Sequence, residues 1–331
     1  MAGVLTTSMR VLTTGGAGYI GSVAVRALGV AGHEVVVLDT LEHGRRDRVL
    51  DARLIVGDVG DEALVADVLR SERIEAVMHF AAYRSVEESN RDPERYRRNN
   101  VDGSRHLFGA MARSDVAILV HSSTCAVYGS PMSLPVAEET PLDPLSPYAS
   151  GKLEIETMIA DLAAEGLLRP VVLRYFNAAG AVPEAGLGES PGRESLIART
   201  VAAAEAGHAM RVFGTDYPTR DGTAIRDFVH VEDLAQAHLL ALELASSGGP
   251  AETINLGSGI GSTVLEVIRA VEIASGRRIE WEPAPRRAGD PAASLADIRR
   301  ASRVLGWTPR RSLDDIAASA WNHAAGAVAP A

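Results

Sequence analysis

Tyr148 and Lys152 lie four positions apart in a segment that opens a predicted helix, so their side chains share one face of it. A phenol with an unperturbed pKa of about 10 is a poor base at neutral pH, but a nearby positive charge favours its phenolate. The phenolate could then take a proton from a carbinol while a hydride leaves for a cofactor. Thr124, which follows a predicted strand, could donate a hydrogen bond to the same oxygen. The three residues predict a site for carbinol oxidation, although Tyr and Lys at this spacing are common on helices.

A glycine-rich turn near the N-terminus predicts where the cofactor binds. Gly16, Gly18 and Gly21 follow a short apolar strand with the spacing GxGxxG and precede a helical stretch. This spacing allows a tight turn, a backbone close to a pyrophosphate and a helix whose N-terminus faces the phosphates. A second strand ends in Asp39, at about the 20-residue interval where a carboxylate binds ribose hydroxyls. Because such an acid repels a 2′-phosphate, the pattern predicts NAD rather than NADP; the alternative is a plain glycine turn with a solvated Asp.

The composition limits the classes of partner. The 331 residues carry a net charge of −10 and a pI near 5.4, which argues against binding to nucleic acid or to an anionic membrane. Cys125 is the only cysteine, which excludes an intramolecular disulfide and fits a reducing compartment. The sequence has no signal-peptide pattern and no apolar run of membrane-spanning length, so we expect a cytoplasmic protein. We expect the residues before Met9 to be unstructured.

The first half of the chain alternates short β-branched strands with helical patterns. This rhythm predicts an α/β fold, with a Rossmann-type doubly wound parallel sheet and a smaller α/β C-terminal substrate domain. We expect the dinucleotide-binding domain over residues 9–176, with later segments returning to it, and the substrate domain over 177–331. Ligands collect at the carboxyl ends of such strands. The predicted strands of the sheet are 11–13, 34–38, 54–56, 76–80, 117–121 and 170–173.

The remaining segments predict two long loops and a mixed second half. Prolines forbid regular helix between 130 and 147, which indicates an ordered loop. Gly, Pro and Glu crowd residues 181–194, which predicts a flexible cover over a site; the alternative is a plain surface loop. Beyond it we expect helices at 196–207, 231–245, 263–275 and 313–324, and strands at 211–213, 253–255 and 278–281.

The motifs in this order resemble the extended short-chain dehydrogenase/reductase family over almost the whole chain. They are TGGAGYIG, GDV at 57–59, HFAA at 79–82, NN at 99–100, SSTCAVYG at 122–129, SPYASGK at 146–152 and LRYFN at 173–177. Downstream, FGTDYPTRDGTAIRDFVHVEDLA at 213–235, NLGSG at 255–259 and RRAGD at 286–290 are similar to the UDP-glucose 4-epimerase branch.

The resemblance implies a mechanism. NAD takes a hydride from C4 of a UDP-hexose while Tyr148 takes the hydroxyl proton. The 4-keto sugar then rotates about its pyrophosphate linkage and receives the hydride on its other face. It also implies a homodimer and no metal.

The resemblance also implies which residues bind cofactor and substrate. Asp58 and Val59 hold adenine, whereas Phe80 and Asn99 line the nicotinamide side. The implied cofactor-binding residues are Gly15, Gly18, Tyr19, Ile20, Gly21, Asp39, Asp58, Val59, Phe80, Ala81, Arg84, Asn99, Tyr148, Lys152, Tyr175 and Phe176. The implied substrate-binding residues are Thr124, Tyr148, Asn177, Phe213, Arg226, Arg286, Asp290 and Ser294. Arg226 and Arg286 also suit phosphate oxygens by their own chemistry, but either could form a surface ion pair. His230, polar within an apolar stretch, is interpreted as structural.

The chain departs from the family pattern at four places. Thr124 stands where a serine is often found, which preserves the hydroxyl. Arg84 stands where the epimerases usually carry lysine, which leaves its cofactor contact open. The segment 194–198 lacks the Asn or His and the Pro expected there, which leaves contacts near the uridine–sugar linkage open. Ser294 stands where epimerases restricted to unmodified hexoses tend to carry an aromatic residue. We hypothesise that Ser294 leaves room for an N-acetyl group; the alternative is a loop residue of no consequence.

Three other functions remain as alternatives. A UDP-pentose or uronate 4-epimerase has the same motifs. A nucleotide-sugar 4,6-dehydratase shares the Tyr-Lys pair, but its relatives place Asp-Glu after the threonine, where this chain has Cys125 and Ala126. A non-catalytic module that senses NAD(H) would not need Tyr148 or Lys152, and both are present.

Overall fold

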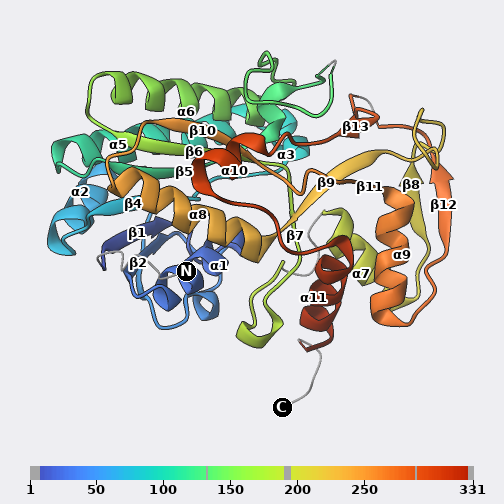
Figure 1. Ribbon diagram of the computed structural model, residues 1–331. Coiled ribbons are helices and arrows are strands. Elements are labelled where there is room, and N and C mark those ends of the chain that lie inside the picture. Colours follow the sequence, from blue (N-terminus) through green and yellow to red (C-terminus); the bar gives the residue numbers. More distant parts are fainter. Residues whose placement is uncertain (1–7, 132, 190–194, 288, 327–331) are drawn as a thin grey trace. The chain divides into compact units, whose positions relative to one another are not determined.

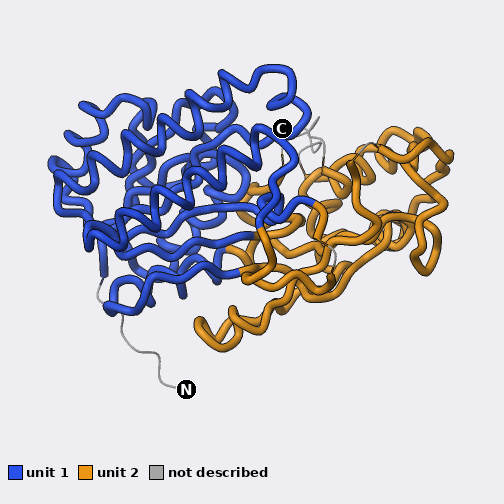
Figure 2. The backbone as a smooth tube through the Cα atoms, turned by 90° about the horizontal axis from the view of Figure 1, so that it is seen from above, with its two compact units in different colours: residues 1–129, 142–174, 235–254 blue, residues 130–141, 175–234, 255–331 orange. Residues whose placement is uncertain are grey.

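The computed structural model describes residues 8–131, 133–189, 195–287 and 289–326. These residues form two compact units that interleave along the sequence, shown in different colours in Figure 2. Unit 1 comprises Met1–Gly129, Leu142–Arg174 and Ala235–Ile254, and unit 2 comprises Ser130–Pro141, Tyr175–Leu234 and Asn255–Ala331. The predicted boundary after residue 176 lies close to the change from unit 1 to unit 2 after Arg174.

The main sheet of the protein has seven strands. Their order across the sheet is β10-β6-β5-β4-β1-β2-β3. The neighbouring pairs β3–β2, β2–β1, β1–β4 and β4–β5 are parallel. This order, with β1 between β2 and β4, is that of a doubly wound dinucleotide-binding sheet, so the predicted fold class is confirmed. The strands are β1 (Arg10–Thr14), β2 (Glu34–Asp39), β3 (Arg53–Val56), β4 (Ala76–His79), β5 (Ile118–Thr124), β6 (Arg169–Tyr175) and β10 (Glu252–Leu256).

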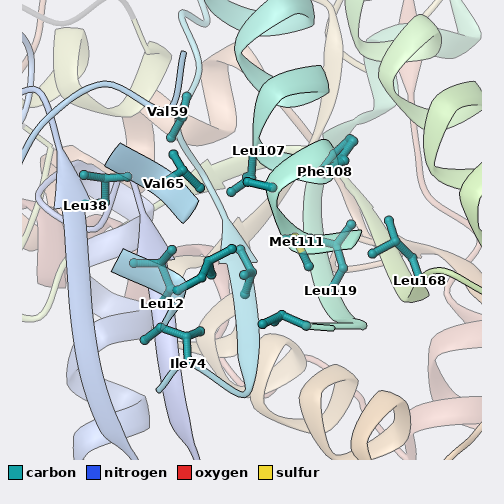
Figure 3. Packing of buried hydrophobic residues seen from close by; sticks show 14 of the residues in the cluster. Leu12, Leu38, Val59, Val65, Ile74, Leu107, Phe108, Met111, Leu119 and Leu168 are labelled. Carbon is teal, nitrogen blue, oxygen red and sulfur yellow. The ribbon is translucent and has the colours of Figure 1, made fainter. Parts of the chain in front are cut away.

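Helices cover both faces of this sheet because successive residues of each strand point to opposite sides. In β2, Val36 and Leu38 pack into the large core on one face, whereas Val37 packs with Val25 on the other. Figure 3 shows part of the large core, where side chains of β1, β2 and β5 meet those of α2 and α5. The helices and helical turns are α1 (Tyr19–Val30), η1 (Arg46–Val49), α2 (Glu62–Ser71), α3 (Val86–Arg91), α4 (Pro93–Tyr96), η2 (Arg97–Asp102), α5 (Gly103–Arg113), η3 (Cys125–Tyr128), α6 (Pro147–Ala164) and α8 (Val231–Ser246).

Unit 2 contains two small sheets and helices packed on them. In the first sheet, β9 pairs with β11, β13 and β7, and in the second β8 pairs with β12 (Figure 1). Val201, Val212, Ile268 and Val271 belong to its core. The elements are β7 (Asn177–Ala179), η4 (Pro183–Ala185), α7 (Leu196–Ala206), β8 (Met210–Phe213), β9 (Ile225–His230), β11 (Gly261–Thr263), α9 (Val264–Ser275), β12 (Trp281–Ala284), β13 (Ala293–Ser294), α10 (Arg299–Leu305) and α11 (Leu313–Gly326).

The second half differs from the sequence prediction in its strands. β7, β9, β11 and β13 were not predicted, because three of them have only two or three residues and β9 contains charged residues. The predicted strand 278–281 is shifted, since β12 begins at Trp281. Thr263 is the N-cap of α9, whose hydroxyl accepts the Glu266 N–H, rather than its first residue.

The two predicted loops have different outcomes. The described residues between η3 and α6 form neither helix nor strand, as predicted, and Val136 is held by hydrogen bonds to Leu295, Asp297 and Asn255. Within 181–194, residues 190–194 lie outside the described residues, so the cover remains a prediction. The described residues contain no helix that is long and apolar enough to cross a membrane.

Candidate active site

The glycine loop between β1 and α1 has a backbone that side chains would block. Gly15 has a φ of +69°, and a Cβ atom there would lie 2.6 Å from the Ala81 nitrogen. A Cβ at Gly21 would lie 2.3 Å from the Gly15 carbonyl oxygen. Gly18 is the N-cap of α1 and, as a glycine, gives the N-terminus of this helix no side-chain cap. This cradle at the N-terminus of a twelve-residue helix fits the pyrophosphate of a dinucleotide.

Asp39 lies at the end of β2, next to this loop. Its buried carboxylate accepts hydrogen bonds from the backbone N–H of Ala17, at 3.0 Å, and of Leu41, at 2.8 Å. Two fixed N–H donors orient the carboxylate and leave lone pairs for the ribose hydroxyls that we expect it to bind. After β3, Asp58 is exposed and accepts the Gly60 N–H, whereas Val59 is buried.

The segment after β4 is fixed by two neighbouring asparagines in η2, a π-helical turn. Asn100 is buried and binds the backbone of Tyr83 through both ends of its amide, at 2.8 and 2.9 Å. Asn99 donates to the Asn100 side chain at 2.8 Å. Single π-helical turns occur frequently at functional sites, so η2 is a signal that the sequence alone did not show. Nearby, the ring of Phe80 lies 4.7 Å from that of His238.

Lys152 is held inside unit 1 by α6. The Ser146 hydroxyl caps this helix by accepting the Ala149 N–H, and Pro147 occupies its first turn, which requires no N–H donor there. Lys152, one turn beyond Tyr148, is only 4% exposed, and its Nζ donates to the Ser122 carbonyl oxygen at 2.7 Å. Burial lowers the pKa of this ammonium group to about 8, against the opposing effect of the Glu156 carboxylate.

Thr124 and Tyr148 form the predicted hydroxyl pair. Burial raises the pKa of the Tyr148 phenol to about 12, while the hydrogen bond with Thr124 and the charge of Arg84 lower it. The Thr124 Oγ1 atom already accepts the Ala126 N–H at 3.1 Å, so its own proton is available to the Tyr148 oxygen. A hydrogen bond donated by Thr124 favours the phenolate, but in this structure burial outweighs it. Arg84, where the family usually has lysine, therefore acts electrostatically on the same phenol.

Two buried histidines of unit 1 interact electrostatically with Lys152, and sequence reasoning missed both. His79 is bound on both ring nitrogens, by Thr14 at 2.7 Å and Ser104 at 2.9 Å, and burial lowers its pKa to about 3. His121 is 0% exposed, and neither of its ring nitrogens has a hydrogen-bond partner among the described residues. Burial lowers its pKa well below the usual range. Both imidazoles are therefore neutral at physiological pH.

In unit 2, Arg226 and Asp290, both predicted to bind substrate, form an ion pair with each other. The side chain of Arg226 is 17% exposed, and its guanidinium also donates to the Ile225 carbonyl oxygen at 2.7 Å. Ser294 lies beside Arg226 in the register of β13 and β9. These three residues, predicted from separate motifs, therefore lie together.

Arg286 and Arg287 lie against two aromatic rings. Arg286 donates to the Asp216 carboxylate at 2.8 Å, and its guanidinium carbon lies 4.2 Å from the centroid of Tyr217. The guanidinium carbon of Arg287 lies 4.3 Å from the centroid of Phe213. Sequence reasoning named Phe213 and Arg286 but missed Arg287, although the adjacent arginines were part of the RRAGD motif.

Asp227 holds the backbone around these residues, a role that the sequence did not reveal. Its buried carboxylate accepts from the N–H and hydroxyl of Ser258, from the Gly259 N–H and from the Ala296 N–H. The Asn177 amide donates to the Asp227 carbonyl oxygen at 2.8 Å. Asp227 thus joins the 255–259 loop to the segment that carries Ser294.

The other predicted residues fall as follows. His230 is buried and bound to Ser319 and Glu232, and burial lowers its pKa to about 4, which agrees with a structural role. In 194–198, Glu194 lies outside the described residues, and Ser195 caps α7. Tyr175 and Phe176 belong to unit 2, with Phe176 bound through its N–H to Leu256. No group of three or more His, Cys, Asp or Glu in the described part of the chain could hold a metal ion.

The fold and the site define a class: a Rossmann-type sheet with a glycine loop that fits a dinucleotide, in the same unit as Thr124, Tyr148 and Lys152. Residues 11–257 match the model of the NAD dependent epimerase/dehydratase family. The match covers more than half of the chain, and the chain therefore belongs to that family. The resemblance inferred from the motifs is confirmed.

Individual relatives agree with this assignment. The chain is 43% identical over 317 residues to UDP-glucose 4-epimerase of Lactobacillus helveticus, covering 95% of this chain and 96% of the relative. It is 44% identical over 317 residues to UDP-glucose 4-epimerase of Azospirillum brasilense, covering 95% and 91%. Among solved structures, it matches UDP-glucose-4-epimerase (galE) from Stenotrophomonas maltophila with bound NAD and formylated UDP-arabinopyranose. That match has a TM-score of 0.93 and 40% identity, over 97% of this chain and 100% of the other.

Proposed function

We infer that this chain is an NAD-dependent isomerase that inverts C4 of a UDP-hexose, interconverting UDP-glucose and UDP-galactose. The observation that carries the inference is the Thr124, Tyr148 and Lys152 arrangement in a chain about 43% identical to UDP-glucose 4-epimerases over 95% of its length. The loss of the dehydratase Asp-Glu pair at Cys125 and Ala126 supports the same choice.

The chemistry of the chain's own residues follows from their geometry. Tyr148 takes the proton of the C4 hydroxyl and later returns it, and the Thr124 hydroxyl donates to the same oxygen. NAD+, when bound, would supply an acceptor for the C4 hydride and a positive charge that favours the phenolate. Lys152, one helical turn further along α6, contributes a positive charge when it is protonated. Since burial raises the pKa of Tyr148 to about 12, the phenolate needs opposing stabilisation from the Thr124 hydrogen bond and from nearby cations.

We propose that unit 2 recognises the nucleotide sugar. Arg226, Arg286 and Arg287 provide guanidinium groups for pyrophosphate oxygens, and Phe213 offers a ring for stacking against uracil. Asn177 and Asp290 bind the sugar side. The proximity of Ser294 and Arg226 supports a role for Ser294 in substrate choice, with UDP-N-acetylhexosamines accepted besides UDP-galactose.

We further propose a homodimer located in the cytoplasm. A single cysteine, Cys125, fits a reducing compartment. Light scattering after size-exclusion chromatography tests the dimer, and a monomer at micromolar concentration would contradict it.

The assay of the function uses purified protein without added cofactor. UDP-galactose is converted to UDP-glucose, followed by proton NMR, and denaturation of the protein releases NAD in a ratio near one per chain. If UDP-galactose is not converted even with added NAD+, the hexose assignment is wrong, and UDP-pentoses and UDP-uronates become the substrates to test.

A further inference from the structure

Lys152 is the only lysine in the sequence. The sequence has 33 lysines and arginines in total, and all of them except Lys152 are arginines. Arginine stays charged in proteins, whereas a buried lysine can lose its proton because burial penalises the ammonium form. The chain therefore has its one titratable amine side chain at a buried position beside the proposed base, where the charge of that amine matters most.

A buried ion pair lies one helical turn beyond Lys152. Glu156 lies four positions along α6, and its carboxylate accepts hydrogen bonds from Arg174 of β6. Arg174 Nε lies 3.0 and 3.1 Å from the two carboxylate oxygens, and Arg174 Nη2 lies 2.5 Å from one of them. The two side chains are only 8% and 7% exposed. A buried pair of this kind contributes little net stability, because the loss of hydration offsets the attraction between the charges. Its presence thus calls for a role other than stability.

The same ion pair joins the elements that carry the proposed catalytic residues. Ser123 of β5 donates to the Glu156 carboxylate at 2.5 Å, while the neighbouring Ser122 accepts from Lys152. Arg174 Nη1 donates to the Tyr128 hydroxyl at 2.9 Å, at the end of the η3 turn that Thr124 caps. Glu156 therefore fixes α6 against β5 and, through Arg174, against η3.

The other charged or titratable groups near Lys152 do not replace this carboxylate. His79 from β4 and His121 from β5 act electrostatically on Lys152, and both are neutral at physiological pH. His238 from α8 acts on His121. Tyr148, on α6 itself, has a raised pKa and stays protonated until further positive charge is present. Glu156 is the carboxylate that favours the charged form of Lys152.

We propose that Glu156, held in its buried ion pair with Arg174, is a positioning residue for the reaction. Its carboxylate keeps the Lys152 ammonium group protonated and locks α6 in register with β5. The proposal deepens the proposed function, on which its catalytic consequence rests. It adds that the alkaline limit of the activity is set by a residue that touches neither substrate nor cofactor.

The single lysine allows a direct test. Protein labelled with ¹³C at lysine Cε gives one lysine resonance, that of Lys152, and its chemical shift is followed between pH 6 and 11. We expect a midpoint near 8 in the purified holoenzyme. In Glu156→Gln the midpoint falls by on the order of one pH unit, because an opposite charge nearby is lost. The pH midpoint of the alkaline limb of the kcat profile also falls by this interval, while KM for UDP-galactose is unchanged.

Two further variants separate this role from a purely structural one. Glu156→Met/Arg174→Met removes both charges, so no unpaired arginine remains buried, and it carries the test if the single variant does not fold. We expect its lysine midpoint also to lie below that of the wild type. Glu154→Gln is the matched control, because Glu154 lies on the same helix but pairs with Arg97 and Arg105; its midpoint stays at the wild-type value.

The outcomes decide between the roles. An unchanged lysine midpoint in folded Glu156→Gln overturns the proposal, as does a double variant whose midpoint returns to the wild-type value, since the unpaired Arg174 then explains the shift. The resonance is measured without substrate, so a chain that fails to epimerise UDP-galactose but shows the midpoint shift contradicts the proposed function and leaves the role of Glu156 standing.

Discussion

The charged residues proposed for catalysis in unit 1 and the Arg286–Asp216 pair of unit 2 differ in their exposure. In unit 1, Lys152, Glu156 and Arg174 are each less than 10% exposed and form hydrogen bonds with buried groups. In unit 2, Arg286 is 44% exposed and its partner Asp216 is 73% exposed. Exposed ion pairs contribute about 0–1 kcal/mol, so Arg286 can exchange its carboxylate for a phosphate at small cost. The buried set suits one fixed chemical step, and the exposed set suits recognition that a ligand completes.

This contrast predicts that variants in unit 1 change kcat and variants in unit 2 change KM. Tyr148→Phe gives the largest effect, since it removes the proposed base. We expect kcat to fall by about 10²- to 10⁴-fold, with NAD content and thermal stability retained. Steady-state kinetics with UDP-galactose measure it. Loss of NAD with the activity would instead place Tyr148 among residues needed for folding or cofactor retention.

Arg226→Met tests the recognition side. The loss of one charge-assisted hydrogen bond, worth about 1.5–3 kcal/mol, should raise KM for UDP-galactose roughly 10- to 100-fold with kcat within a few-fold of wild type. Arg220→Met is the matched control, because Arg220 pairs with Glu266 on the exposed surface of the same unit. Equal effects in both variants, or an effect on kcat alone, would contradict the division between the units.

Ser294→Tyr sharpens the comparison within unit 2. If Ser294 leaves room for an N-acetyl group, the larger side chain should lower kcat/KM for UDP-GlcNAc by tenfold or more and leave UDP-galactose nearly unaffected. This loss corresponds to about 1.4 kcal/mol or more. The ratio of the two kcat/KM values, measured in competition, is the readout. An unchanged ratio would make Ser294 a residue without influence on substrate choice.

His121→Phe is the smallest change and concerns stability alone. Both ring nitrogens of His121 are buried without partners among the described residues, and an unsatisfied donor costs about 1–3 kcal/mol. A phenyl ring beside Phe108 removes this cost, so we expect the free energy of unfolding to rise by about 1 kcal/mol. Denaturant unfolding measures it. A destabilised variant would indicate that the imidazole has a polar partner in solution.

The same contrast explains what the sequence could predict. The parallel sheet, the glycine loop, Asp39 and the Tyr148–Lys152 pair depend on local patterns of strand, turn and helix, and the fold class was confirmed. The Glu156–Arg174 pair, the contacts of Asp227 and the place of Arg287 depend on which strands become neighbours. β9 and β13, for example, are joined across more than sixty residues of sequence. No local pattern shows that Asp227 binds Ser258 and Ala296, because that contact exists only once the tertiary fold has formed.

The most direct test of the central claim follows the hydrogen at C4. UDP-galactose deuterated at C4 is converted by the holoenzyme in ordinary water, and the UDP-glucose formed is examined by NMR and mass spectrometry. A hydride that leaves and returns within the site predicts that the deuterium stays on C4 of the product. Product that has lost this deuterium to solvent would show that C4 is inverted by proton exchange, and would contradict the account.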